Sequence, residues 1–285
     1  MPHLQTSAGR VSYTDTGTGP ILMLLHATLH DRHDYDPVLP ALAAGHRVIA
    51  VDWPGHGESD ADAGGQPVTA AVLADVLEEV VLEKNLRDLR LIGNSVGGFA
   101  AARLAIRHPD RVAGLVLVDN GGFDANPIMR TFCRVLGTPA ITKRLMPRFI
   151  KSYMQPKTAS DHAIVKRAVA RARTPEGAAL AASMWRSFAT PEHDLRDQAD
   201  KLTAPTQILW GKKDKAAPLK VGRATHKRLP HSNLEILDTG HVVFSSEPEA
   251  FVRVVEPFLA SLPVGARCGD QATTRDAPPA VACAR

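Results

Sequence analysis

The stretch Gly93-Asn94-Ser95-Val96-Gly97-Gly98 decides the fold class of this 285-residue chain. It follows an apolar run at residues 89–92, typical of a buried strand, and it precedes an Ala-rich segment at 97–108, typical of a helix. A G-x-S-x-G sequence between a strand and a helix places its serine on a sharp turn, with the hydroxyl projecting above a sheet. We therefore identify Ser95 as the candidate nucleophile.

The alternation of strands and helices continues on both sides of this turn. Further strands, most of them short apolar runs suited to burial on both faces of a parallel sheet, are predicted at residues 11–14, 21–25, 47–51, 116–118, 206–210 and 234–237. Apolar residues at steps of three and four predict helices over residues 35–44, 69–84 and 248–262. This order predicts an α/β fold with a mainly parallel, doubly wound sheet.

The strand pattern stops after residue 121 and returns after residue 200. Residues 122–199 show only helical periodicity, so we predict a helical cap inserted into a core formed by residues 1–121 and 200–262. The cap carries 13 Lys and Arg against 6 Asp and Glu. Such a lid could steer a carboxylate-bearing substrate, or its cations could simply cover solvated helix faces. Residues 263–285 are rich in Gly, Pro and Ala without periodicity, so we expect a disordered tail.

The overall composition excludes several classes of protein. Hydrophobic residues make up 44% and charged residues 22%, which is typical of a globular protein rather than a disordered or fibrous one. No uncharged apolar stretch is long enough for a transmembrane helix, so we expect no membrane partner. The net charge of +4 comes without a run of like charges, so we expect no nucleic-acid partner. Three scattered cysteines and an N-terminus without a signal-peptide pattern predict a cytoplasmic protein; the oligomeric state stays open.

A nucleophilic serine needs a base, and the base needs an acid that orients it. Asp214 and His241 each follow a predicted strand, and the chain order of serine, acid and histidine suits a nucleophile of this type. Sites in open α/β sheets form at the carboxyl ends of strands, where both residues are expected to lie. Asp119, at the end of another strand, is the alternative acid.

Two backbone N–H groups are needed to bind the oxyanion of the intermediate. We assign one to Val96, which follows the nucleophile. The other should come from the loop after residues 21–25, where Thr28 is our assignment and Leu29 the alternative.

These motifs resemble the capped, cofactor-free serine hydrolases of the α/β-hydrolase fold superfamily. The matching segments are His26-Ala27, Asp52-Trp53-Pro54-Gly55-His56-Gly57-Glu58-Ser59, Gly93-Asn94-Ser95-Val96-Gly97-Gly98, Trp210-Gly211-x-x-Asp214 with Pro218, and Gly240-His241. The resemblance implies a serine hydrolase that cleaves a carboxylic ester, thioester or lactone of a small-molecule acyl substrate through an acyl-enzyme, without a cofactor. The family usually has His-Gly where this chain has His26-Ala27, so the oxyanion loop is expected to differ in shape.

Two other functions stay open at this point. Carbon–carbon bond hydrolases of ring-fission keto acids share Gly-Asn-Ser-x-Gly-Gly, but they typically carry Trp after the catalytic histidine, where this chain has Val242. A non-catalytic hydrolase-fold protein that only binds a ligand could keep the same triad. Ser95 argues against the dehalogenase and epoxide-hydrolase branches, because their nucleophile is an aspartate.

Several further side chains are expected to contact the substrate. His30 lies in the predicted oxyanion loop, and Arg186 is the cap cation that we select. The full set of expected contacts is His26, His30, Asn94, Trp185, Arg186 and Val242. The spacing of His26, His30 and His33 could also hold a metal ion. We expect no metal, because serine catalysis needs none.

Overall fold

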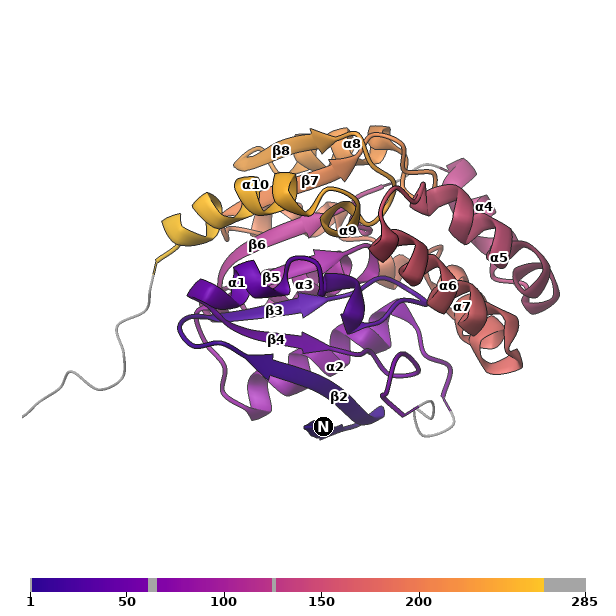
Figure 1. The fold of residues 1–285 in the computed structure, drawn as a ribbon, viewed down its shortest axis with the longest axis horizontal. Coiled ribbons are helices and arrows are strands. Elements are labelled where there is room, and N and C mark those ends of the chain that lie inside the picture. Colours follow the sequence, from indigo (N-terminus) through magenta and orange to yellow (C-terminus); the bar gives the residue numbers. More distant parts are fainter. Residues whose placement is uncertain (1, 61–65, 125–126, 264–285) are drawn as a thin grey trace, which may run out of the picture.

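A computed structural model describes residues 2–60, 66–124 and 127–263, and its centre is a mainly parallel sheet (Figure 1). The strands run in the spatial order β1-β2-β4-β3-β5-β6-β7-β8. β1 and β2 pair antiparallel, as do β2 and β4, while the other neighbours pair in parallel. The strands are β1 (His3–Thr6), β2 (Gly9–Thr16), β3 (Ile21–Leu25), β4 (Arg47–Val51), β5 (Leu89–Asn94), β6 (Val112–Val118), β7 (Thr206–Gly211) and β8 (Ser232–Leu237).

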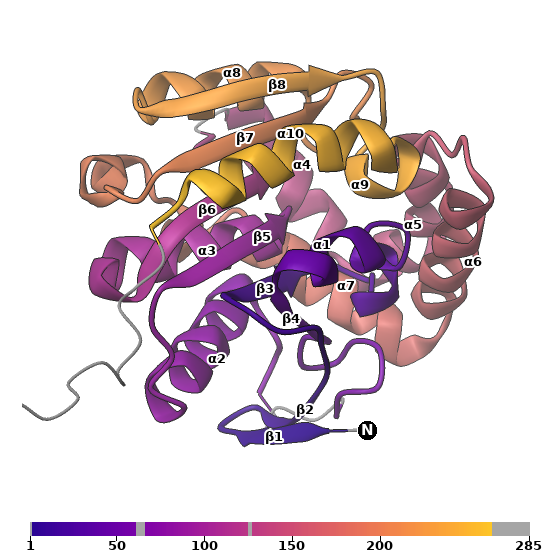
Figure 2. The same ribbon diagram turned by 60° about the vertical axis from the view of Figure 1, so that its left-hand side comes forward.

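Helices cover both faces of this sheet, as Figures 1 and 2 show. One face packs on α2 (Ala70–Glu83), α3 (Val96–Arg107) and α8 (Leu219–Arg228), and the other on α1 (Leu39–Gly45), α9 (Val243–Ser246) and α10 (Pro248–Ser261). Successive residues of a strand point to opposite faces of the sheet. In β5, Leu91 packs in the core on the side of α2, α3 and α8, and Ile92 packs in the core on the side of α1, α9 and α10. The predicted α/β fold with a doubly wound, mainly parallel sheet is confirmed.

The structure contains β1, α8 and α9, which the sequence did not predict. β6 begins at Val112 rather than at residue 116, and the helix predicted over residues 35–44 begins only at Leu39. Pro40 stands in the first turn of this helix, where the missing N–H of a proline costs nothing, whereas Pro37 cannot donate the N–H that an interior helical position requires. A separate 3-10 turn, Arg32–Tyr35, precedes it.

The segment between β6 and β7 folds into helices at one end of the molecule (Figure 1). They are α4 (Pro127–Leu136), α5 (Pro139–Met154), α6 (Ala159–Arg173) and α7 (Pro175–Ser187). Pro127, Pro139 and Pro175 begin α4, α5 and α7, where a missing N–H costs nothing, while Pro147 lies inside α5. Thr158 and Asp161 form a capping box at the start of α6. We keep the name cap for these helices, and the domain boundaries stay a prediction.

Two further expectations concern the C-terminal tail and membrane-spanning helices. Of the predicted tail, residues 264–285 lie outside the described part of the chain. Among the residues that are described, none of the helices has both the length and the apolar character needed to cross a bilayer.

Candidate active site

Ser95 sits on a strained turn between β5 and α3, with φ 56° and ψ −114°. The glycines around it are required by close backbone contacts. A Cβ on Gly93 would lie 2.5 Å from the carbonyl oxygen of Gly97, and one on Gly97 would lie 2.2 Å from that of Leu25. Only glycine therefore lets the strand, turn and helix approach this closely, and the turn presents Ser95 at the N-terminus of α3.

Asp214 and His241 meet at the ends of β7 and β8. His241 Nδ1 lies 2.6 Å from Asp214 Oδ2, and Asp214 Oδ1 accepts a hydrogen bond from the N–H of Ala216 at 2.7 Å. Both side chains are buried. Because a carboxylate only accepts hydrogen bonds, the Nδ1 atom carries the proton of a neutral imidazole and Nε2 keeps its lone pair. This tautomer suits a base that takes a proton at Nε2.

The backbone of His241 is also held from two sides. Its N–H donates to the carbonyl of Tyr153 on the cap at 3.0 Å. The side-chain Nδ2 of Asn94 donates to the carbonyl of His241 at 3.0 Å and to the carbonyl of Val118 at 3.1 Å. Asn94 thus ties the nucleophile strand to the histidine loop, and it does not line the cavity as expected of a substrate contact.

Ser95 and His241 line one cavity of about 110 Å³ between the sheet and the cap. Most of its wall is apolar, and the cap contributes Met129, Cys133, Met146, Tyr153, Trp185 and Phe188. Within the described residues, Ser95 makes no side-chain hydrogen bond to His241, a contact that in unliganded enzymes often tightens only when substrate binds. The cavity thus combines a candidate nucleophile and a candidate base with an apolar wall.

The predicted oxyanion residues all reach this cavity. Val96 is the first residue of α3, so its N–H has no partner within the helix. Ala27 to His30 form a turn, with the His30 N–H donating to the Ala27 carbonyl at 3.2 Å and Leu29 at φ 68°. Thr28 and Leu29 both line the cavity. Their backbone N–H groups donate to no other group within the described residues, so either one can serve an oxyanion.

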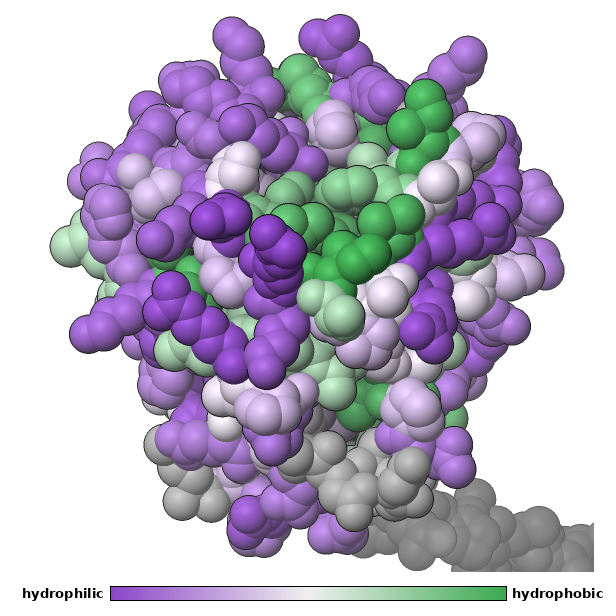
Figure 3. Space-filling model, turned by 90° about the vertical axis from the view of Figure 1, so that its right-hand side faces the viewer, coloured by the Kyte–Doolittle hydropathy of each residue, from purple (hydrophilic) through white to green (hydrophobic). Residues whose placement is uncertain are grey.

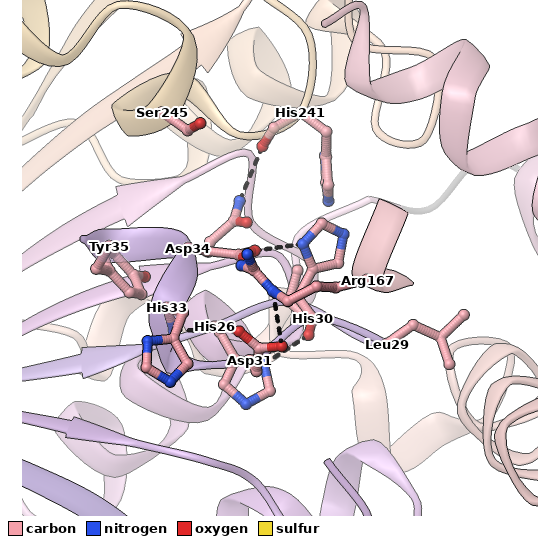
Figure 4. Close-up of polar contacts among 12 residues, drawn as sticks. His26, Leu29, His30, Asp31, His33, Asp34, Tyr35, Arg167, His241 and Ser245 are labelled. Carbon is pink, nitrogen blue, oxygen red and sulfur yellow. Dashed lines mark hydrogen bonds and ion pairs between the residues drawn. The ribbon is translucent and has the colours of Figure 1, made fainter. Parts of the chain in front are cut away.

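Two arginines of α6 fasten this loop to the cap, and Figure 4 shows one of them, Arg167. Arg171 Nη1 donates to the carbonyls of Leu29 and His30, each at 2.6 Å. Arg167 bonds Asp31 at 3.2 Å and Asp34 at 2.9 Å. A left-handed conformation is costly for leucine, and these contacts hold Leu29 in it.

Asp119, the alternative acid, lies beside the pair. Its Oδ1 accepts from the Gly211 N–H at 2.9 Å, and its Oδ2 is buried without a hydrogen-bond partner. Burial raises the pKa of Asp119 well above its ordinary value, and the charge of neighbouring Asp214 raises it further. Asp214, not Asp119, lies within hydrogen-bond distance of His241 Nδ1, at 2.6 Å, so the geometry favours Asp214 as the orienting acid.

One group of possible metal ligands occurs among the described residues. Ligand atoms of Asp119, Asp214 and His241 lie within 4.8 Å of one another. His241 Nδ1 and Asp214 Oδ2 are already joined, so a metal ion would have to break that hydrogen bond. The three histidines of the oxyanion loop do not form such a group: His30 bonds Asp34, His33 bonds Asp36 at 3.1 Å, and His26 accepts from the Trp53 N–H at 3.0 Å.

Of the six expected substrate contacts, only Trp185 lines the cavity. His26 is fully buried between Ala27 and Trp53 and supports the loop from behind. His30 reaches the cavity wall only through Tyr153, whose hydroxyl lies 3.0 Å from Nε2.

Val242 and Arg186 also lie away from the cavity. Val242 is packed in the core, and Arg186 donates to the carbonyl of Gly137 at 2.8 Å. The sequence reasoning missed Arg130, Tyr153 and His193, which do line the cavity. Helical periodicity alone could have shown that α4 and α5 have a buried side, but not which of their residues face the nucleophile.

Comparison with known proteins places this site in a family. The family model for the alpha/beta hydrolase fold matches residues 20–248. A pimeloyl-[acyl-carrier protein] methyl ester esterase of Neisseria meningitidis is 29% identical over 249 residues, covering 83% of this chain and 91% of that protein. A 2-hydroxy-6-oxononadienedioate/2-hydroxy-6-oxononatrienedioate hydrolase of Cupriavidus pinatubonensis is 29% identical over 273 residues, covering 88% and 91%.

A solved structure points the same way. A thermophilic esterase from Thermogutta terrifontis superimposes with a TM-score of 0.74 and 27% identity, over 91% of this chain and 97% of that one. Its fold, and the family model that spans most of this chain, agree with the strand–turn–helix around Ser95. The chain belongs to the alpha/beta hydrolase fold family, and the protein is a hydrolase.

Proposed function

We propose that the protein is a serine hydrolase that cleaves a carboxylic ester, thioester or lactone through an acyl-enzyme on Ser95. The observation that carries the proposal is the shared cavity: a serine on a strained strand-to-helix turn lines it together with His241, whose Nδ1 is held 2.6 Å from a buried carboxylate. Neither feature alone specifies this chemistry, but together they match the roles of nucleophile, base and orienting acid.

In the first half-reaction, His241 Nε2 takes the proton of Ser95 Oγ as Oγ bonds to the carbonyl carbon. The carbonyl electrons move to oxygen, where the N–H of Val96 and that of Thr28 or Leu29 bind the negative charge. Asp214 stabilises the imidazolium that forms. The imidazolium then gives its proton to the leaving oxygen or sulfur as that bond breaks, and the acyl group remains on Ser95.

In the second half-reaction, water takes the place of the leaving group. His241 removes a proton from the water as its oxygen attacks the acyl carbon, and the same N–H groups bind the oxyanion again. Collapse of the intermediate breaks the bond to Ser95 Oγ, which regains its proton from His241. The products are a carboxylic acid and the free enzyme.

The cavity limits the acyl group. Its volume of about 110 Å³ is smaller than the ~150 Å³ apolar cavity that accommodates benzene, so a short acyl chain fits best. An apolar wall with few polar groups favours an uncharged acyl chain. The esterase relative supports ester cleavage, although the acyl-carrier substrate in its name belongs to that protein.

Carbon–carbon bond hydrolysis of a keto acid is the second candidate. It is favoured by the relative of that class, which is as similar to this chain as the esterase. Arg130 in the cavity wall could face a substrate carboxylate, although Asp194 already pairs with it at 2.8 Å. The mainly apolar wall favours the ester reaction.

The test is hydrolysis of p-nitrophenyl esters with acyl chains of increasing length by the wild type and by Ser95→Ala. We expect serine-dependent turnover that is highest for short chains. Full activity in Ser95→Ala would refute the mechanism. Labelling of Ser95 by a fluorophosphonate without ester turnover would favour the keto-acid reaction, tested directly with a dienoic keto acid. The absence of both labelling and turnover would favour a protein that binds a ligand without catalysis.

The remaining expectations, on location, cofactor and nucleic-acid binding, stay predictions. They are a cytoplasmic location, no cofactor and no nucleic-acid partner.

A further inference from the structure

The outer surface of α4 and α5 combines two features that rarely coincide on a solvated helix pair. Between residues 127 and 160 the chain has seven Lys and Arg and no Asp or Glu. On the same helices Ile128, Val135 and Leu145 are 78%, 45% and 42% exposed. They are three of the five large apolar side chains that are exposed in the described part of the chain. An exposed apolar cluster with a polar rim marks an interaction site.

Most of these cations have no partner among the described residues. Arg130 pairs with Asp194, and Lys157 pairs with Glu247. The side chains of the other five are exposed and form no ion pair or hydrogen bond with any described residue; they are Arg134, Lys143, Arg144, Arg148 and Lys151. On the core, by contrast, arginines such as Arg47, Arg103 and Arg107 are paired with carboxylates. We call these five cations, with Ile128, Val135 and Leu145, the cap face.

This charge distribution specifies the partner's chemistry. Five unpaired cations attract an anionic surface, and their long aliphatic stems let the charged ends reach it while apolar neighbours insert. Ile128, the most exposed of the apolar residues, would need a matching pocket on a folded protein, whereas a fluid lipid layer accepts it without one. Figure 3, which faces this end of the molecule, shows apolar surface bordered by hydrophilic side chains.

We propose that the cap face docks the enzyme on an anionic lipid bilayer surface. The cap face lies over the cavity, because Met129 and Cys133 of α4 and Met146 of α5 line its wall. Docking there would place the cap, and the cavity that it helps to line, next to the membrane, where apolar esters concentrate. The proposal departs from the expectation of no membrane partner, which rested only on the lack of a spanning helix, because a helix pair that lies on the bilayer surface does not need to span it.

The charge part of the proposal is tested by vesicle flotation with the full chain. Vesicles of phosphatidylcholine with about a third phosphatidylserine should bind the wild type, and pure phosphatidylcholine should not. Each Lys or Arg near an anionic surface contributes about a fivefold gain in binding. Lys143→Gln with Arg144→Gln should therefore weaken binding about thirtyfold, and added salt should weaken the wild type in the same direction.

The matched control removes the same charge elsewhere. Lys220 and Arg223 on α8 are also exposed and without a partner among the described residues. No large apolar side chain is exposed on α8. Lys220→Gln with Arg223→Gln should leave vesicle binding within twofold. Equal weakening by both pairs would overturn the proposal, because binding would then follow total charge and not the cap face.

The apolar part has its own readout. Ile128→Ser with Val135→Ser should weaken binding to anionic vesicles at high salt, where charge is screened. An unchanged affinity in this variant would refute insertion. Failure of the wild type to bind anionic vesicles, with saturable binding of a soluble acidic protein instead, would overturn the bilayer as partner. None of these measurements uses turnover, so they stand apart from the test of Ser95.

Discussion

Acid should destabilise this protein through a histidine that the catalytic reaction does not use. His26 is fully buried behind the oxyanion loop, where its Nδ1 donates to the Ala27 carbonyl at 2.7 Å and its Nε2 accepts from the Trp53 N–H. Desolvation by burial is the main reason that the pKa of His26 falls to about 3. In the unfolded chain it returns to about 6.5.

The size of the effect follows from these two values. At pH values between these two pKa values, His26 binds a proton in the unfolded chain but not in the folded one. The stability that neutral His26 contributes is therefore fully present above about pH 6.5 and falls as the pH drops. A pH of about 5 lies roughly 1.5 units below the pKa of His26 in the unfolded chain, so the loss of unfolding free energy at that pH is about 2 kcal/mol, at 1.36 kcal/mol per unit. His26→Gln keeps an oxygen acceptor for the Trp53 N–H but cannot gain a proton.

Urea unfolding at about pH 7.5 and about pH 5 measures this contribution. The variant should be less stable than the wild type at the higher pH, because one hydrogen bond is lost. Its further loss on acidification should be smaller than that of the wild type by about 2 kcal/mol. His231→Gln, an exposed histidine, should leave the acid-induced loss unchanged. Equal losses in wild type and His26→Gln would refute the argument, since carboxylates contribute equally to both.

Three further predictions concern the site. Arg171→Ala should lower kcat about tenfold or more with a smaller effect on KM, because Arg171 orients the oxyanion loop without lining the cavity, and Arg171→Lys should restore part of the lost kcat. Arg173 is exposed on the same helix, so Arg173→Ala is the control. An equal loss of steady-state rate in Arg173→Ala would contradict the role of Arg171. Trp185→Ala should shift the preferred p-nitrophenyl ester to a longer acyl chain by enlarging the cavity, and an unchanged chain-length profile would remove Trp185 from the acyl pocket. Gly97→Ala should lower the free energy of unfolding by about 3 kcal/mol or more, because the added Cβ would meet the Leu25 carbonyl. Urea unfolding measures this loss, and a variant that unfolds at the same urea midpoint as the wild type would show that the turn can relax.

The features predictable from the sequence are those set by short-range patterns. Apolar runs of strand length and helical steps of three and four gave the correct order of elements around Ser95. In a parallel sheet the carboxyl ends of strands meet at one edge, so the topology alone predicts that residues just after β7 and β8 lie near each other. The Asp214–His241 pair at 2.6 Å lies where that topology predicts it.

The contacts of the cap and the oxyanion loop needed the tertiary structure. Asn94 and His30 carry polar side chains beside the site, but their partners are 147 and 123 residues away in the chain, and those partners turn both side chains away from the cavity. The rotation of each cap helix about its axis is likewise set by packing against the core, which periodicity does not encode. The sequence by itself thus determined the order of the strands and helices around Ser95 and the strand ends that carry Ser95, Asp214 and His241. Only the tertiary structure decided that Arg171 holds Leu29 and that Tyr153, not Arg186, lines the wall, because such contacts join segments that local spacing cannot relate.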